Sequence, residues 1–95
     1  MRFLVQATLA TLLLALPASA QCYADYRAQQ SNPVRFHYGV VQLPDAACDD
    51  ARAAAEYLRP RLQQDGWIFV DLLSTFGPEG LNSRRERAGQ FYLRY

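Results

Sequence analysis

The stretch "QQDGWIFVDLL", Gln63 to Leu73, holds the end of one predicted element and the start of the next. Gly66 suits the position just past a helix, because glycine takes the left-handed conformation without a Cβ penalty. A predicted strand, Trp67–Thr75, begins on the next residue. It is apolar on both faces near its start, so we expect a central strand covered on both sides. Asp71 is its one charge.

A long amphipathic helix is predicted upstream of this turn. The acids within 45–50 suit its N-terminus, because carboxylates cap free N–H groups and meet the positive end of the helix dipole. Pro60 inside the helix removes one hydrogen bond at a cost of about 3 kcal/mol. The helix either kinks there or breaks and restarts at Pro60, and we prefer a kinked continuous helix. The residues of its apolar face are Ala51, Ala54, Ala55, Leu58 and Leu62.

Two elements are predicted ahead of this helix. Residues 22–30 contain helix formers and no breaker, and Asn32-Pro33 ends the run, because a residue before proline avoids the helical region. We therefore expect a short N-terminal helix. Residues 36–43, "FHYGVVQL", are aromatic and β-branched, which predicts a strand. Gly39 within that strand indicates a bulge or a close neighbour over this position.

The last third of the chain starts with a long connection, residues 76–89, that carries the turn dipeptides Gly-Pro and Glu-Gly. Within it, Leu81–Ala88 has the composition of a short helix. The final residues, Gln90–Tyr95, alternate apolar and polar side chains, which predicts a terminal strand. We expect this strand to pair antiparallel with the strand before it.

Together these elements predict an α+β fold with a small three-stranded sheet. The long helix covers one face, and the short N-terminal helix covers the other. A right-handed crossover joins the strands that flank the long helix if those strands are parallel.

Residues 1–20 have the three-part pattern of a secretory signal peptide, with Arg2, an apolar run and small residues ending at Ala20. The run is shorter than the roughly 20 residues that cross a bilayer. Cleavage after Ala20 leaves Gln21 first and places the protein in the periplasm or outside the cell. A lipoprotein acylated on Cys22 is the alternative, which Gln21 disfavours because it is not small.

The remaining residues, 21–95, form one small domain. Small domains bury a low fraction of their surface and often need a covalent staple. Cys22 and Cys48 are the only cysteines of an exported chain, so we predict a disulfide between them, worth roughly 3 kcal/mol in the chain-entropy model. A redox or metal role is the alternative. The chain has no CxxC motif and one histidine, so we expect no metal site and no cofactor.

Net charge disfavours two classes of partner. All ten basic residues are arginine, nine acids balance them, and removal of Arg2 leaves a neutral domain. Nucleic-acid and anionic-membrane binding usually need a basic excess. The expected partner is therefore an unknown envelope protein or a second copy of the chain.

The pattern of a "HYGVVQL" strand, an amphipathic helix ending "L..DGW" and an apolar strand resembles the DUF4177-type family of small uncharacterised bacterial domains. The resemblance covers about Phe36 to Tyr95 and implies mainly a fold, because no catalytic residue is known in this family to carry over. The "FGPEGL" stretch resembles that of small exported envelope proteins of alphaproteobacteria. The cysteines, Pro60 and the arginine-rich connection depart from the family pattern. The matching positions are Tyr38, Val40, Val41, Leu58, Leu62, Gly66, Trp67 and Val70.

Catalysis would centre on His37, the single histidine, with Asp71 as its carboxylate partner. No serine lies in a nucleophile-like context, and paired cysteines leave no thiol. We therefore expect a non-enzymatic accessory or protein-interaction module.

Two binding sites are considered. Arg84, Arg85 and Arg87 form the densest charge cluster, and with Arg94 on the terminal strand they are the predicted partner-binding residues, because arginine forks suit acidic or phosphorylated surfaces. The edge of the terminal strand is a second route to a partner or a second copy. The alternative function is a small apolar-ligand-binding protein, with a pocket lined by Tyr38, Trp67 and Phe69. Packing of these aromatic residues in the core is the competing interpretation.

Overall fold

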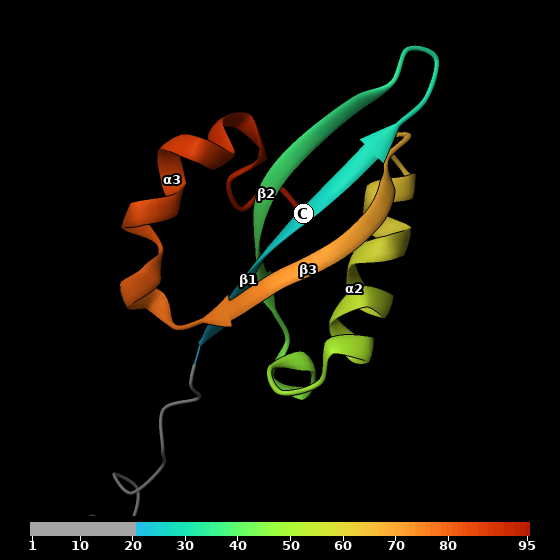
Figure 1. Cartoon of the computed structure of the whole chain (residues 1–95). Helices are drawn as coiled ribbons and strands as arrows, with labels where there is room; N and C mark the ends of the chain where they lie inside the picture. The colour runs from blue at the N-terminus through green and yellow to red at the C-terminus, as the bar shows by residue number, and fades with distance from the viewer. Residues whose placement is uncertain (1–20) are drawn as a thin grey trace, which may run out of the picture.

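The computed structural model describes residues 21–95 (Figure 1), so the predicted signal peptide lies outside the described residues. The order is β1 (Cys22–Gln30), β2 (Arg35–Leu43), α2 (Ala51–Gln63), β3 (Ile68–Phe76) and α3 (Asn82–Ala88). Short 3-10 turns follow β2, β3 and α3, at Asp45–Ala47, Pro78–Gly80 and Gly89–Phe91. An α+β fold with a three-stranded sheet is confirmed. No helix of the described part is long and apolar enough to cross a membrane.

The sheet has the order β2-β1-β3, and both neighbours run antiparallel to β1. The prediction that the strand after Trp67 is central is therefore wrong: β3 is an edge strand, and Ile68, Val70 and Leu73 are exposed. Its pairing with β1 skips one residue at Leu73 and another at Val70, which makes two β-bulges. Because β2 and β3 are both antiparallel to β1, they run parallel to each other with β1 between them.

The predicted helix over 22–30 is also wrong, because these residues form β1, the central strand. Its side chains alternate between the two faces: Ala24 and Ala28 face α2 and are fully buried, whereas Asp25 and Arg27 lie on the opposite face. Alanine favours a helix in isolation, but here the two small side chains leave room for the helix to approach the sheet. Tertiary packing overrides the local propensity.

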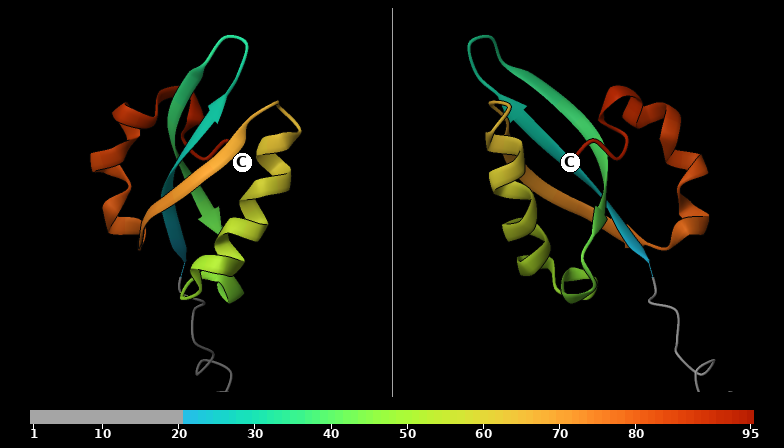
Figure 2. Two further views of the ribbon diagram at one scale, coloured as in Figure 1. Left: turned by 45° about the vertical axis from the view of Figure 1, so that its right-hand side comes forward. Right: turned by 180° about the vertical axis from the view of Figure 1, so that it is seen from behind.

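Helices α2 and α3 lie on opposite sides of the sheet (Figure 2). The main core lies between α2 and the sheet, where Leu58 and Leu62 pack against Tyr26 and Val41. Helix α3 contacts β2 on the other face and is fixed to β1 by an ion pair between Arg84 and Asp25. A short helix therefore covers this face, but it is α3 and not the N-terminal helix that we expected.

Helix α2 confirms most of the sequence-based reasoning. Its N-cap Asp50 accepts hydrogen bonds from two backbone N–H groups of the first turn at 3.0 and 3.1 Å. The helix runs without a break through Pro60 to Gln63. Gly66 has φ of +82° as predicted, and the Trp67 N–H closes the helix end by donating to the Leu62 carbonyl at 3.0 Å.

The predicted terminal strand is not formed. The C-terminal segment, Gly89–Tyr95, starts with a 3-10 turn, and Leu93 has a positive φ of 53° that interrupts any extended ladder. It touches the outer edge of β2 at one bridge, between Tyr92 and Val40, and the Leu93 N–H donates to the Val40 carbonyl at 2.8 Å. It does not neighbour β3, so the expected antiparallel pair is also wrong.

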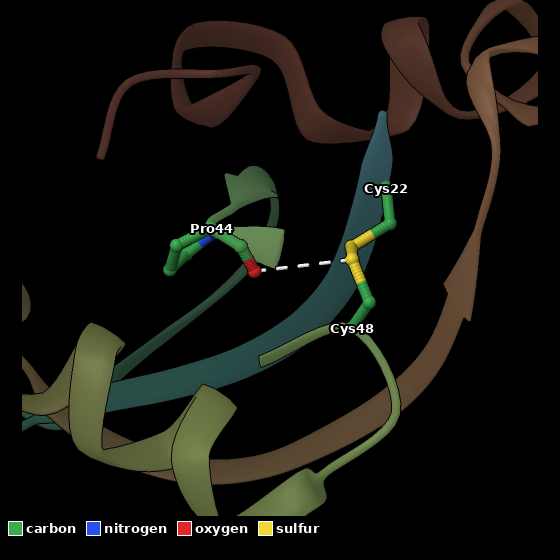
Figure 3. The surroundings of a disulfide bond; sticks show 3 residues. All are labelled: Cys22, Pro44 and Cys48. Atoms are coloured by element: carbon green, nitrogen blue, oxygen red, sulfur yellow. Dashed lines mark hydrogen bonds between the residues drawn. A yellow bond between two sulfur atoms is a disulfide. The ribbon is translucent and has the colours of Figure 1, made fainter. Parts of the chain in front are cut away.

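A disulfide joins Cys22 to Cys48, as predicted, with 5.9 Å between the two Cα atoms (Figure 3). It ties the start of β1 to the turn just before α2. The Cys48 sulfur lies 3.8 Å from the Pro44 carbonyl oxygen. The bond therefore holds the sheet, the turn and the start of the long helix together at one end of the molecule.

Candidate functional site

His37 lies at the centre of an aromatic cluster. Its ring stacks on Phe91 with centroids 3.6 Å apart and meets the edge of Trp67 at 4.3 Å. Its Nε2 forms a hydrogen bond of 2.9 Å with the Tyr26 hydroxyl. These four residues, which we call the His37 cluster, come from β1, β2, the turn after α2 and the C-terminal segment. The cluster therefore fastens the last residues of the chain to the sheet.

The cluster keeps His37 neutral. Burial, and secondarily the positive charge of Arg94, lower the pKa of His37 to about 4. Only 7% of the residue is exposed, and Nδ1 has no hydrogen-bond partner among the described residues. The Tyr26 ring lies directly over Gly39, where a Cβ would collide with the ring. The close neighbour predicted at Gly39 is therefore confirmed.

His37 and Asp71 do not form the catalytic pair considered above. His37 pairs in register with Ala28, on the face that carries α2, whereas Asp71 pairs with Arg27 on the opposite face. Arg27 donates two hydrogen bonds to the Asp71 carboxylate at 2.9 and 2.7 Å, which lowers the pKa of Asp71. Each residue is thus engaged in a separate structural contact.

A second polar centre lies at Asp25, beneath α3. Its carboxylate accepts hydrogen bonds from the Ser74 hydroxyl at 2.6 Å, the Tyr38 hydroxyl at 2.8 Å and Arg84 Nε at 3.0 Å. Burial alone would raise the pKa of Asp25, but the three donors outweigh it and hold that pKa below its usual value. This network joins all three strands to α3. Sequence analysis missed it because Asp25 was expected in a helix.

The predicted arginine cluster lies on α3 and after it. The Arg84 guanidinium is committed to the fold, because it binds Asp25, donates to the Gly80 carbonyl at 2.8 Å and lies over the Phe76 ring. Arg87 lies over the Tyr38 ring at 4.0 Å and Arg85 near Tyr92 at 5.1 Å, and both are exposed.

The predicted ligand pocket is not assembled. Tyr38 points to the α3 face, where it binds Asp25. Phe69 pairs in register with Ala28 on the α2 face and lies under the Arg59 guanidinium, 5.5 Å away. Trp67 is only 8% exposed and packs against His37 and Phe91. The core interpretation of Trp67 is therefore confirmed.

One edge of Trp67 nevertheless borders an open hollow of about 300 Å³. We call it the Trp67 hollow. It is bounded by the hairpin of β1 and β2, by the turn after α2 and by the C-terminal segment. Its walls are Gln30, Arg35, Asp65, Trp67, Gln90, Phe91, Arg94 and Tyr95.

Exposed apolar side chains gather at the hairpin end of the sheet. Val34 and Phe36 are each 68% exposed, and Ile68 is 52% exposed. Phe36 and Ile68 both pair in register with Gln29, so they form one row across the sheet on the face that α3 covers only at its other end. With Val70 on β3, these residues form what we call the hairpin-end surface.

Comparison of the chain with protein-family models, curated proteins and solved structures gave no match. The resemblance to DUF4177-type domains therefore stays a prediction. Within residues 21–95 no three His, Cys, Asp or Glu side chains are grouped so that they could hold a metal ion.

Proposed function

We propose that this chain is an exported, non-enzymatic accessory domain that acts by contacting another envelope protein through the hairpin-end surface. Export follows from the signal-like residues 1–20, with cleavage near Ala20 and residence in the periplasm or outside the cell. The Cys22–Cys48 disulfide supports that compartment, because disulfides persist in oxidising environments. His37, Asp25 and Asp71 are each engaged in contacts within the fold, which supports a function other than catalysis.

The observation that carries the proposal is the row of Phe36 and Ile68 with Val34 beside it. Val34 and Phe36 are the most exposed large apolar side chains of the described chain. Together with Ile68 and Val70 they present roughly 400 Å² of apolar surface, taking for each residue its exposed fraction, 42% to 68%, of a typical side-chain area. An apolar surface of this size on a small monomer commonly marks a contact site.

The area favours a transient contact with a different protein over a stable dimer. Two copies joined through this surface alone would bury roughly 800 Å² in total, whereas stable interfaces bury about 1,200–2,000 Å². A larger partner that also contacts the polar residues around this surface buries enough area for a transient interface. We place the contact here and not at Arg84, because that guanidinium is held by Asp25.

Site-specific photo-crosslinking in cells tests the proposal. Amine-reactive crosslinkers do not suit the chain, because it contains no lysine. A photoreactive phenylalanine analogue replaces Phe36, and the same analogue at Glu56, on the exposed side of α2, is the matched control. We expect a foreign protein captured from position 36 and not from 56, and loss of that capture when Val34→Asp is added.

Two outcomes would overturn the proposal. Adducts that contain only this chain would assign the hairpin-end surface to a second copy. An absence of adducts at position 36, with the variant exported and folded as judged by its disulfide, would remove this surface as the contact.

A further inference from the structure

The Trp67 hollow is built by three segments that are distant in sequence. Gln30 and Arg35 are paired in register at the turn end of the β1–β2 hairpin. Asp65 and Trp67 flank Gly66, whose positive φ turns the chain so that the two side chains border the same space. The C-terminal segment supplies the remaining wall and is held there by the His37 cluster.

The walls of the hollow contain two arginine side chains, Arg35 and Arg94, and one acidic side chain. Asp65 is the only acidic side chain in its walls, and its Oδ2 accepts a hydrogen bond from the Tyr95 hydroxyl at 2.7 Å and lies 3.7 Å from Arg94 Nε. Arg35 has no hydrogen bond or ion pair from its side chain within residues 21–95. The positive field of Arg94 also reaches the ring of His37 behind the wall. The hollow therefore offers one unpaired guanidinium and one partly paired guanidinium.

We infer that the Trp67 hollow binds a small organic anion, with its carboxylate or phosphate held between Arg35 and Arg94. A guanidinium presents a planar set of donors that matches the oxygens of either group. The amides of Gln30 and Gln90 bind uncharged polar groups of the same ligand, and Trp67 and Phe91 contribute a small apolar part of the lining. A volume of about 300 Å³ is at the lower end for ligand sites, so the ligand is small.

This ligand class differs from the apolar ligand expected from sequence. The exposed parts of the walls are mostly polar, and the Trp67 ring is largely covered by its neighbours, so little apolar surface faces the opening. The inference is independent of the contact proposed at the hairpin-end surface, and each stands if the other fails.

Trp67 makes the test direct, because it is the only tryptophan of the chain. The protein, purified after expression of the full chain, is titrated with sodium succinate, with sodium phosphate and with sodium chloride at matched ionic strength. Emission from Trp67 is followed, and equilibrium dialysis with radiolabelled succinate and phosphate measures binding without an optical signal. The variants are Arg35→Gln and, as a matched control remote from the hollow, Arg59→Gln on α2.

We expect saturable binding of succinate or phosphate beyond the chloride effect. Arg35→Gln should weaken it at least about fivefold, as expected for loss of one charge-assisted hydrogen-bond partner, and Arg59→Gln should leave it unchanged. Preference for succinate identifies a carboxylate ligand, and preference for phosphate identifies a phosphorylated one. The inference is overturned if neither probe binds by dialysis, or if Arg35→Gln binds as tightly as the unaltered protein. Because the exposed Arg35 side chain makes no hydrogen bond or ion pair within residues 21–95, its substitution removes no such interaction from the fold.

Discussion

The stability of this protein should fall steeply between pH 7 and pH 4.5 because of one residue, His37. In the folded protein its pKa is about 4, whereas in the unfolded chain it returns to about 6.5. Between these values the unfolded state binds a proton that the folded state does not, so the free energy of unfolding decreases as pH falls. Linkage over this interval gives a loss of about 2.5 kcal/mol at pH 4.5 relative to pH 7.

Urea denaturation followed by circular dichroism at the two pH values measures this loss. The control is His37→Phe, which keeps an aromatic ring against Phe91 and Trp67 but cannot titrate. This variant loses the hydrogen bond to Tyr26, so the comparison concerns the pH dependence of each protein and not its absolute stability. We expect the difference between pH 7 and pH 4.5 to shrink to below about 1 kcal/mol in His37→Phe. Equal losses in both proteins would refute the reasoning.

Three further predictions concern the sheet and its fastenings. Gly39→Ala should destabilise the fold by about 3 kcal/mol, seen as a lower thermal midpoint, because the new Cβ collides with the ring of Tyr26. Asp25→Asn should cost about 3 kcal/mol in urea denaturation, because the buried Asp25 carboxylate loses the charge that its three hydrogen-bond donors stabilise. Asp71→Asn, at an exposed ion pair, should cost clearly less, and equal costs would contradict the assigned burial. Reduction of the disulfide should lower the free energy of unfolding by roughly 3 kcal/mol, and an unchanged denaturation midpoint in reductant would show that the bond does not stabilise the fold.

The elements that sequence analysis predicted correctly are those specified by neighbouring residues. Helix α2 combines an N-cap, an apolar face and a terminal glycine within the seventeen residues from Asp50 to Gly66. Strand β2 and helix α3 likewise contain their own signals. By contrast, β1 is a strand only because β2 and β3 pair with it from both sides, and its alanines carry no local sign of that.

The candidate sites were harder to predict because they depend on contacts between distant segments. The His37 cluster forms because Phe91 packs on His37 of β2. The alternating pattern of residues 90–95 predicted a terminal strand instead, so this contact was not expected. The Asp25 network requires Arg84 to cross from α3 to the central strand. Sequence pattern identified Trp67 as a core residue, but the Trp67 hollow beside it follows from the position of Arg35 and the C-terminal segment.

The two bulges of β3 bear on how a small protein with an open sheet edge avoids aggregation. An edge strand with exposed apolar residues is a template for fibril growth when its backbone ladder is regular. In β3 the ladder is interrupted at Val70 and again at Leu73, so a second strand cannot pair along its whole length. The side chains of this edge remain accessible, while its backbone resists edge-to-edge pairing with another strand. Exposed apolar side chains and an edge that resists strand addition are therefore compatible in this protein.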